Sequence, residues 1–245
     1  MSALAESASQ RTFHDLRAFA GDRKAGNAVA PDGDAFLSAR RLLPIEKGAV
    51  TVAAIDLPAG SGEVTSLAAD EFVIAAEGEV SFTDADGRTV DLAEGRSLVL
   101  AKGARFRWST GSGASLLVVA YPNGGGSAAG IVPIDETAKL EASNPPLAAL
   151  LVGETPSCRN HTDYRSGDGE FVCGTWDSTP YHRLPMVYRH YELMHLLAGS
   201  VTFVDEAGRE GTFRKGDIFL VEAGASCSWD SREHVAKVYA IHRPA

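Results

Sequence analysis

Apolar and polar residues alternate along two stretches of the chain in the way typical of β-strands with one buried face. The stretches are EVSFTD at 79–84 and SVTFVD at 200–205. Each runs into a turn sequence, DADG at 84–87 or DEAG at 205–208, and later into an apolar run, SLVLA at 97–101 or IFLVEAG at 218–224. Short strands separated by Gly-containing turns predict an all-β sandwich or barrel.

These stretches belong to an internal duplication that needs no gaps. The segment 71–108 aligns with 192–229 throughout, and glycines recur in register. The aligned pairs include Glu71 with Glu192, Gly78 with Gly199, Gly95 with Gly216, Gly103 with Gly224 and Trp108 with Trp229. Because glycine accepts backbone conformations that other residues avoid, recurring glycines imply recurring turns. The two halves are therefore predicted to share one fold.

The duplication divides the chain into four parts. We predict an N-terminal β-barrel at 48–121 and a C-terminal β-barrel at 169–245, with an N-terminal arm at 1–47 that has no repeat partner. The segment 122–168 is rich in Gly, Ser and Pro, which favours an irregular connector crossing the surface.

Composition removes several classes of function. The 245 residues carry a net charge of -9 and no basic cluster, which argues against nucleic-acid binding. No apolar run approaches the ~20 residues of a membrane helix, and the first ten residues lack a signal-peptide pattern, so we expect a cytoplasmic protein without membrane contact. The three cysteines are far apart and are predicted to be free thiols.

The repeat resembles the cupin superfamily of jelly-roll barrels. The end of that family's first motif, E-x6-G, is matched by Glu192 with Gly199 and by Glu71 with Gly78. The glycines of its second motif are matched by Gly216 with Gly224 and by Gly95 with Gly103. The C-terminal copy is similar to the ethanolamine-utilisation-type cupins, a group often labelled ureidoglycine-aminohydrolase-like. The matching stretches are CGTWDSTP at 173–180, YELMHLLAGSVTFVDEAG, FRKGDIFLVEAGASCSW and VAKVYAI at 235–241. The resemblance implies a bicupin, with barrels packed face to face or by strand exchange, and allows a homodimer.

The metal ligands that the resemblance would imply are missing. Metal-binding cupins carry H-x-H three or four residues before the glutamate, where this chain has PMVY at 185–188. The histidine of the second motif is replaced by Cys227, and by Phe106 in the N-terminal copy. Because such a metal needs three or four converging ligands, we predict no cofactor. The alternative is a divalent transition metal held by His190, Glu192 and Cys227.

A candidate pocket follows from strand alternation. Tyr188, His190, Glu192 and Met194 share one face, which the cupin pattern points into the barrel. We predict Glu192 and His190 as catalytic acid–base residues, with Glu192 as a purely structural hydrogen-bond acceptor as the alternative. The predicted ligand-binding residues, including two indoles for stacking, are Trp176, His182, Tyr188, Cys227 and Trp229. Cys227 can also be inert filler, and Glu71 is expected to be structural.

Two hypotheses about function remain open at this point. In the first, the C-terminal barrel binds a small polar metabolite, with nitrogen-containing compounds as one candidate class, and binding alone and acid–base turnover are both allowed. In the second, both pockets are filled by side chains, and the protein is a non-catalytic sensor or assembly module. An open pocket that carries Glu192 would favour the first hypothesis, and a pocket plugged by Tyr188, Met194 and Trp229 would favour the second.

Overall fold

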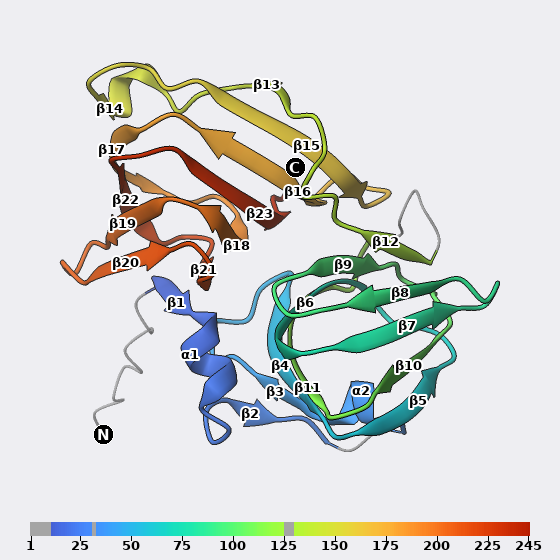
Figure 1. Ribbon diagram of the computed structural model, residues 1–245. Coiled ribbons are helices and arrows are strands. Elements are labelled where there is room, and N and C mark those ends of the chain that lie inside the picture. The colour runs from blue at the N-terminus through green and yellow to red at the C-terminus, as the bar shows by residue number, and fades with distance from the viewer. Residues whose placement is uncertain (1–10, 31–32, 125–129) are drawn as a thin grey trace, which may run out of the picture.

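The computed structural model describes residues 11–30, 33–124 and 130–245 and consists of two antiparallel β-barrels (Figure 1). Residues 1–10 and 31–32 of the predicted arm, and 125–129 of the predicted connector, lie outside the described residues. The predicted all-β fold with two tandem barrels is confirmed. Among the described residues, no helix has the length and apolar character needed to cross a membrane.

Each barrel pairs a seven-stranded sheet with a smaller sheet. In the N-terminal barrel, the seven-stranded sheet has the spatial order β12 (Ile131–Pro133), β9 (Ser97–Leu100), β6 (Asp70–Gly78), β11 (Ala114–Tyr121), β4 (Thr51–Leu57), β3 (Arg40–Leu42) and β2 (Asn27–Ala28). Its smaller sheet has the order β5 (Gly60–Val64), β10 (Phe106–Thr110), β7 (Val80–Asp84) and β8 (Thr89–Leu92). In the C-terminal barrel, the seven-stranded sheet has the spatial order β1 (Phe13–Asp15), β21 (Ile218–Val221), β18 (Tyr191–Ala198), β23 (Val235–His242), β16 (Phe171–Ser178), β15 (Cys158–Arg165) and β13 (Glu141–Ser143). Its smaller sheet has the order β14 (Leu151–Val152), β17 (Tyr181–Val187), β22 (Ser226–Ser231), β19 (Ser200–Val204) and β20 (Glu210–Arg214). The described residues also contain three short helical segments, α1 (Leu16–Gly21), α2 (Ala35–Ser38) and the 3-10 turn η1 (Ala148–Leu150).

The two barrels exchange their leading strands. β1, which precedes the N-terminal barrel in sequence, pairs with β21 of the C-terminal barrel. β12, which precedes the C-terminal barrel in sequence, pairs with β9 of the N-terminal barrel. Because β9 and β21 are aligned copies of the repeat, the exchange is reciprocal, and Figure 1 shows β1 beside β21 and β12 beside β9. Of the two modes of packing expected from sequence, strand exchange is present.

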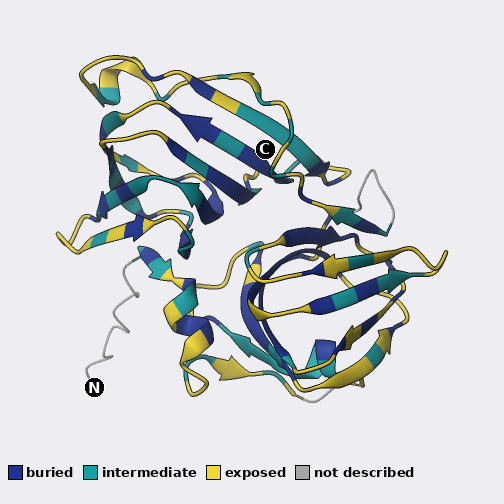
Figure 2. Ribbon diagram, viewed as in Figure 1, coloured by how far each residue is buried: buried dark blue, intermediate teal, exposed yellow. Residues whose placement is uncertain are grey.

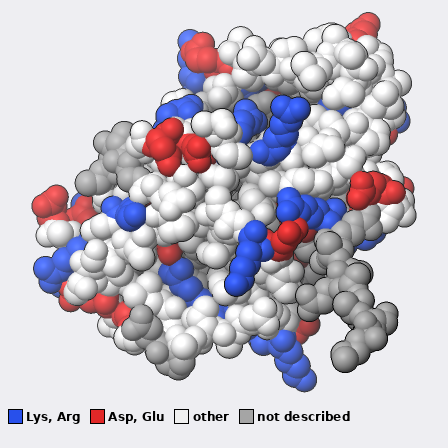
Figure 3. Space-filling model, turned by 180° about the vertical axis from the view of Figure 1, so that it is seen from behind, with Lys and Arg blue, Asp and Glu red and all other residues white. Residues whose placement is uncertain are grey.

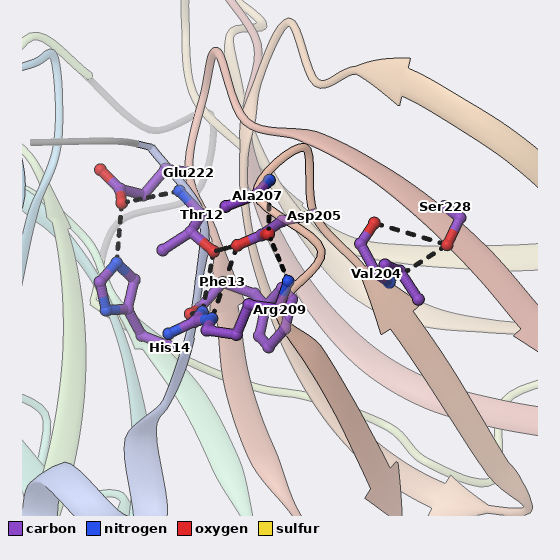
Figure 4. A network of polar contacts seen from close by, with 9 residues as sticks. All are labelled: Thr12, Phe13, His14, Val204, Asp205, Ala207, Arg209, Glu222 and Ser228. Carbon is purple, nitrogen blue, oxygen red and sulfur yellow. Dashed lines mark hydrogen bonds and ion pairs between the residues drawn. The ribbon is translucent and has the colours of Figure 1, made fainter.

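Polar contacts fix β1 to the C-terminal barrel (Figure 4). Thr12 donates to the Asp205 carboxylate at 2.6 Å, and the His14 ring lies 2.7 Å from the Glu222 carboxylate. Arg209 donates both to the Thr12 hydroxyl and to the Phe13 carbonyl. The N-terminal arm is thus a structural part of the distant barrel, because its backbone and side chains both bind there.

The barrels also pack against each other through their seven-stranded sheets. On β6, Phe72 and Ile74 belong to an apolar cluster shared by both barrels, as do Tyr191 and Leu193 on β18. Buried residues accordingly occupy both faces of these sheets (Figure 2). Since side chains alternate along a strand, the even-numbered residues of β18, including Glu192, point into the C-terminal barrel.

His195 lies on the opposite face of β18 from Glu192 and is buried close to Gly95 and Arg96 of the N-terminal barrel. Burial, with Arg17 and Arg96 nearby, lowers its pKa from 6.5 to about 4, although Asp217 opposes the shift. The unfolded chain therefore binds a proton between pH 6.5 and 4 that the folded chain does not bind. This contribution to stability is fully present above pH 6.5 and is lost as the pH falls towards 4.

We therefore expect the free energy of unfolding, measured by urea denaturation, to fall between pH 7 and 4 by on the order of 2 kcal/mol more in the wild-type protein than in His195→Gln. The two proteins share every other titrating group, so the difference between their pH profiles isolates His195. Parallel profiles would contradict this assignment.

The connector is more regular than expected. It contributes β12 to one barrel and β13, β14 and β15 to the other, and β15 pairs with β16 along nearly its whole length. The sequence CRNHTDYR of β15 lacks apolar alternation, so pairing with β16 rather than a local pattern creates this strand. The boundaries 48–121 and 169–245 stay proposals. The sheets of both barrels also include strands from outside these ranges. Figure 3 shows Lys and Arg side chains interspersed with Asp and Glu side chains over one face.

Candidate functional site

The C-terminal barrel contains a cavity of about 590 Å³. Its wall is formed mainly by β15, β16, β17, β18, β22 and β23, and it reaches the chain end at Ala245. A volume of this size suits a small organic ligand. Glu192, His190, Trp176, Tyr188 and Trp229, all predicted from sequence as site residues, line it.

The centre of the site is a buried chain of three charged or ionisable side chains. Lys237 donates from Nζ to Oε1 of Glu192 at 2.7 Å, and Nε2 of His190 lies 3.1 Å from Oε2 of the same carboxylate. Each of the three residues is no more than 7% exposed. Glu192 and His190 come from β18 and the residue before it, whereas Lys237 projects from the neighbouring strand β23. The carboxylate therefore has a partner on each oxygen.

Electrostatics keep Glu192 ionised. Burial alone would raise its pKa, but the Lys237 ammonium and the His190 hydrogen bond outweigh burial and hold the pKa well below the usual carboxyl range. A carboxylate that stays ionised can only accept hydrogen bonds, so Nε2 of His190 carries the proton in this contact. In a neutral ring, Nδ1 is then left as an acceptor.

Aromatic rings surround the ammonium group. The Nζ atom of Lys237 lies 4.7 Å from the ring centre of Trp176 and 5.2 Å from that of Trp229. Tyr181 stacks on Trp229 with ring centres 5.4 Å apart and planes 6° from parallel. Together these residues form an aromatic wall, which both stabilises the cation and offers flat apolar surface to a ligand.

A second buried cation lines the cavity on β17. Arg183 is 3% exposed and donates to the carbonyls of Leu184 and Cys227 and to the hydroxyl of Tyr188, at 3.1–3.2 Å. Its guanidinium also lies 5.5 Å from the Tyr188 ring centre. Lys237 and Arg183 are thus two buried cations on the cavity wall, and Glu192 is a buried carboxylate there.

Two residues predicted from sequence do not line the cavity. Cys227 is fully buried in the apolar core of the barrel, and burial raises the pKa of its thiol to about 11. It therefore does not join His190 and Glu192 and is mostly unreactive at neutral pH. His182 lies between Tyr181 and Arg183, whose side chains line the cavity, so alternation along β17 turns it to the other face.

The corresponding carboxylate in the N-terminal barrel is arranged differently. Glu71 forms two hydrogen bonds with Arg40 of the arm, at 2.8 and 2.9 Å. The Phe36 ring, carried by α2, packs edge-on against Phe82 and Phe106 inside the barrel. This barrel is filled by its own chain, which gives Glu71 the structural environment expected from sequence.

A divalent metal does not fit the residues of the C-terminal site. The positions that would carry histidines before the glutamate present Met186 and Tyr188 to the cavity, and the carboxylate of Glu192 is already neutralised by Lys237. Within the described parts of the chain, no group of three or more His, Cys, Asp or Glu is placed to hold a metal ion. The cation beside the carboxylate here is an ammonium group.

Three residues of the cavity wall, Lys237, Arg183 and Tyr181, were not predicted from the sequence. Lys237 lies within VAKVYAI, where Val235, Lys237 and Tyr239 share one face of a strand. A lysine on the buried face of an otherwise apolar strand is a recognisable signal for a paired or functional charge. Arg183 gave no such signal, because a register shift separates it from Met186.

Comparisons with known proteins agree with this fold. The family model described as EutQ-like cupin domain matches the chain twice, at residues 45–113 and 165–239. No match was found among curated protein sequences.

Several solved structures resemble the whole chain. A protein of unknown function from Pseudomonas syringae pv. tomato, assigned to the DUF861 family, is 27% identical, with a TM-score of 0.83 over 95% of this chain and 100% of its own. Protein Ylba from E. coli, also DUF861, is 12% identical, with a TM-score of 0.58 over 99% of this chain and 97% of its own. A salicylate 1,2-dioxygenase from Pseudaminobacter salicylatoxidans is 11% identical, with a TM-score of 0.56 over 99% of this chain and 87% of its own. The two matches of low identity support the barrel fold alone. With both of its barrels matched by the family model, the chain belongs to the EutQ-like cupin family.

Proposed function

We propose that the C-terminal barrel binds a small polar organic molecule in its cavity and that the N-terminal barrel serves as structural support. The observation that carries this proposal is the buried Lys237–Glu192–His190 chain on the wall of a 590 Å³ cavity. Burying an ion pair costs desolvation energy that apolar packing avoids, so its presence beside open space favours a role in binding.

The contrast between the two barrels supports the proposal. At the repeat position occupied by Glu71, the arm supplies Arg40 and the barrel interior is packed with aromatic rings. At the position of Glu192, Trp176, Tyr188 and Trp229 stand around a cavity instead of plugging it. This difference favours a binding function over a sensor or assembly module with two filled pockets.

The same side chains can move a proton. When the His190 ring is neutral and its Nε2–H donates to the ionised Glu192, Nδ1 is left as a base for an acidic group of a ligand. Lys237 keeps the Glu192 carboxylate ionised throughout. Acid–base turnover through His190, oriented by Glu192, is therefore the reaction that we propose for this site.

The test is a thermal-shift screen of small acids, amides, amines and ureas, followed by calorimetry on Glu192→Gln and, as a matched control, Glu71→Gln. A ligand at 100 times its dissociation constant should raise the wild-type melting temperature by roughly 5 to 10 °C. We expect Glu71→Gln to keep the shift and Glu192→Gln to lose it. EDTA treatment should leave the shift unchanged, since Lys237 supplies the positive charge. Equal binding by both variants would refute the site, and a wild-type protein that binds nothing would refute the function.

A further inference from the structure

Arg183 has hydrogen-bonding capacity that the protein does not use. A guanidinium has five N–H donors. Nη1 of Arg183 donates to the carbonyls of Leu184 and Cys227, and Nη2 donates once, to the hydroxyl of Tyr188. Within the described residues, Nε–H and the second Nη2–H have no acceptor. In a guanidinium, Nε–H and one of the two Nη2–H groups lie on the same edge of the planar group and point the same way.

The charge on Arg183 is also unbalanced. Its three partners are neutral, and across the described residues it forms no ion pair. Glu192, the carboxylate of the inner cavity, is shared between Lys237 and His190. The acidic residues Asp168 and Glu170 also line the cavity, but they bind the Tyr121 hydroxyl. A cation that is 3% exposed and lacks an anion is costly, which implies that the missing charge comes from outside the protein.

We propose that the ligand of the C-terminal barrel carries a carboxylate that binds the open edge of Arg183. Two parallel N–H groups match the two oxygens of a carboxylate, a geometry that arginine provides and lysine does not. The carboxylate balances the charge of Arg183, while Trp176, which is only partly buried, contacts the rest of the molecule. This inference rests on the proposed binding function and narrows the ligand class to organic acids.

The experiment uses matched sets of compounds that share one carbon skeleton. Each set contains an acid, its primary amide, the corresponding amine and the phosphate monoester, and the skeletons run from two-carbon chains to a benzene ring. Binding to the full-length protein is measured by titration calorimetry at constant ionic strength. We expect acids to bind and their amides and amines to bind at least about 30-fold more weakly, because an ionic hydrogen-bonded pair is lost.

Variants then locate the carboxylate. Arg183→Met should weaken binding of the best acid by about 30-fold or more, and Arg183→Lys, which keeps the charge but lacks the fork, should fall between it and the wild type. Arg232→Met is the matched control, because Arg232 is an exposed arginine paired with Asp230 and should leave binding unchanged. Arg183→Lys keeps the test valid even if Arg183→Met does not fold.

The outcomes separate the two proposals. If amides, amines or phosphate monoesters bind best, or if acids bind Arg183→Lys and wild type equally well, the carboxylate inference is wrong while the binding function stands. If no compound of any set binds the wild-type protein, both proposals fail. Selective binding of acids that depends on Arg183 supports both.

Discussion

Replacing Lys237 with methionine is expected to lower the free energy of unfolding at pH 7 by about 3 to 5 kcal/mol. Methionine keeps most of the aliphatic length of lysine but removes the ammonium group. The Glu192 carboxylate then remains buried with His190 as its hydrogen-bond partner and no compensating cation on Oε1. Breaking a buried pair on one side is costly because it leaves an uncompensated charge.

Urea denaturation of Lys237→Met and of the double variant Lys237→Met/Glu192→Gln measures this effect. The double variant should recover most of the loss, because neither charge is left alone. A single variant within about 1 kcal/mol of the wild type would show that the pair contributes little.

The pH dependence of this variant should reverse in sign. In the wild type, the Glu192 pKa lies below its unfolded value, so its contribution to stability is present above the usual carboxyl range and is lost as the pH falls. Without Lys237, burial raises the pKa above the unfolded value, and stability is then gained as the pH falls. The deficit of Lys237→Met should therefore shrink between pH 7 and 4.

Much of the fold was predictable because the duplication keeps its turn glycines in register. Gly78 and Gly199 both adopt positive φ, 74° and 73°, which confirms that the turn recurs. Strand alternation also placed His190 and Glu192 on the interior face of β18, because that face is defined by local sequence. The local sequence pattern was sufficient to assign a side chain to a face wherever the residue lay within a regular strand of the repeat.

The pattern failed where distant segments determine the structure. β1 pairs with a strand about two hundred residues further along the chain, and nothing in FHD identifies that partner. The same limit hid Arg40, whose pairing with Glu71 depends on how the arm folds over the barrel. At β17, the register shift between Arg183 and Met186 interrupts the alternation, so the faces of His182 and Arg183 could not be counted back from Tyr188. Because of such a shift, the sequence alone does not show which side chains lie on which face of the strand.

The largest effect expected in the N-terminal barrel comes from Arg40. We predict that Arg40→Met lowers the free energy of unfolding by about 3 kcal/mol, because it leaves the buried Glu71 carboxylate without its two hydrogen bonds from the guanidinium. The guanidinium also lies 5.0 Å from the Phe36 ring centre, so the packing of α2 weakens with it. Urea denaturation measures the loss. Arg105→Met, which removes an exposed pair with Glu63, should change stability by less than about 1 kcal/mol.

The Arg40 variant also distinguishes the roles of the two repeat carboxylates. Arg40→Met/Glu71→Gln should regain most of the lost stability, because the unpaired charge is gone. Acid binding by the C-terminal barrel should match the wild type in both the single and the double variant, since Arg40 contacts the N-terminal barrel. If ligand binding weakened in the double variant at temperatures where the protein remains folded, the N-terminal barrel would have to contribute to the binding site. The assignment of Glu71 to structure and Glu192 to ligand would then be wrong.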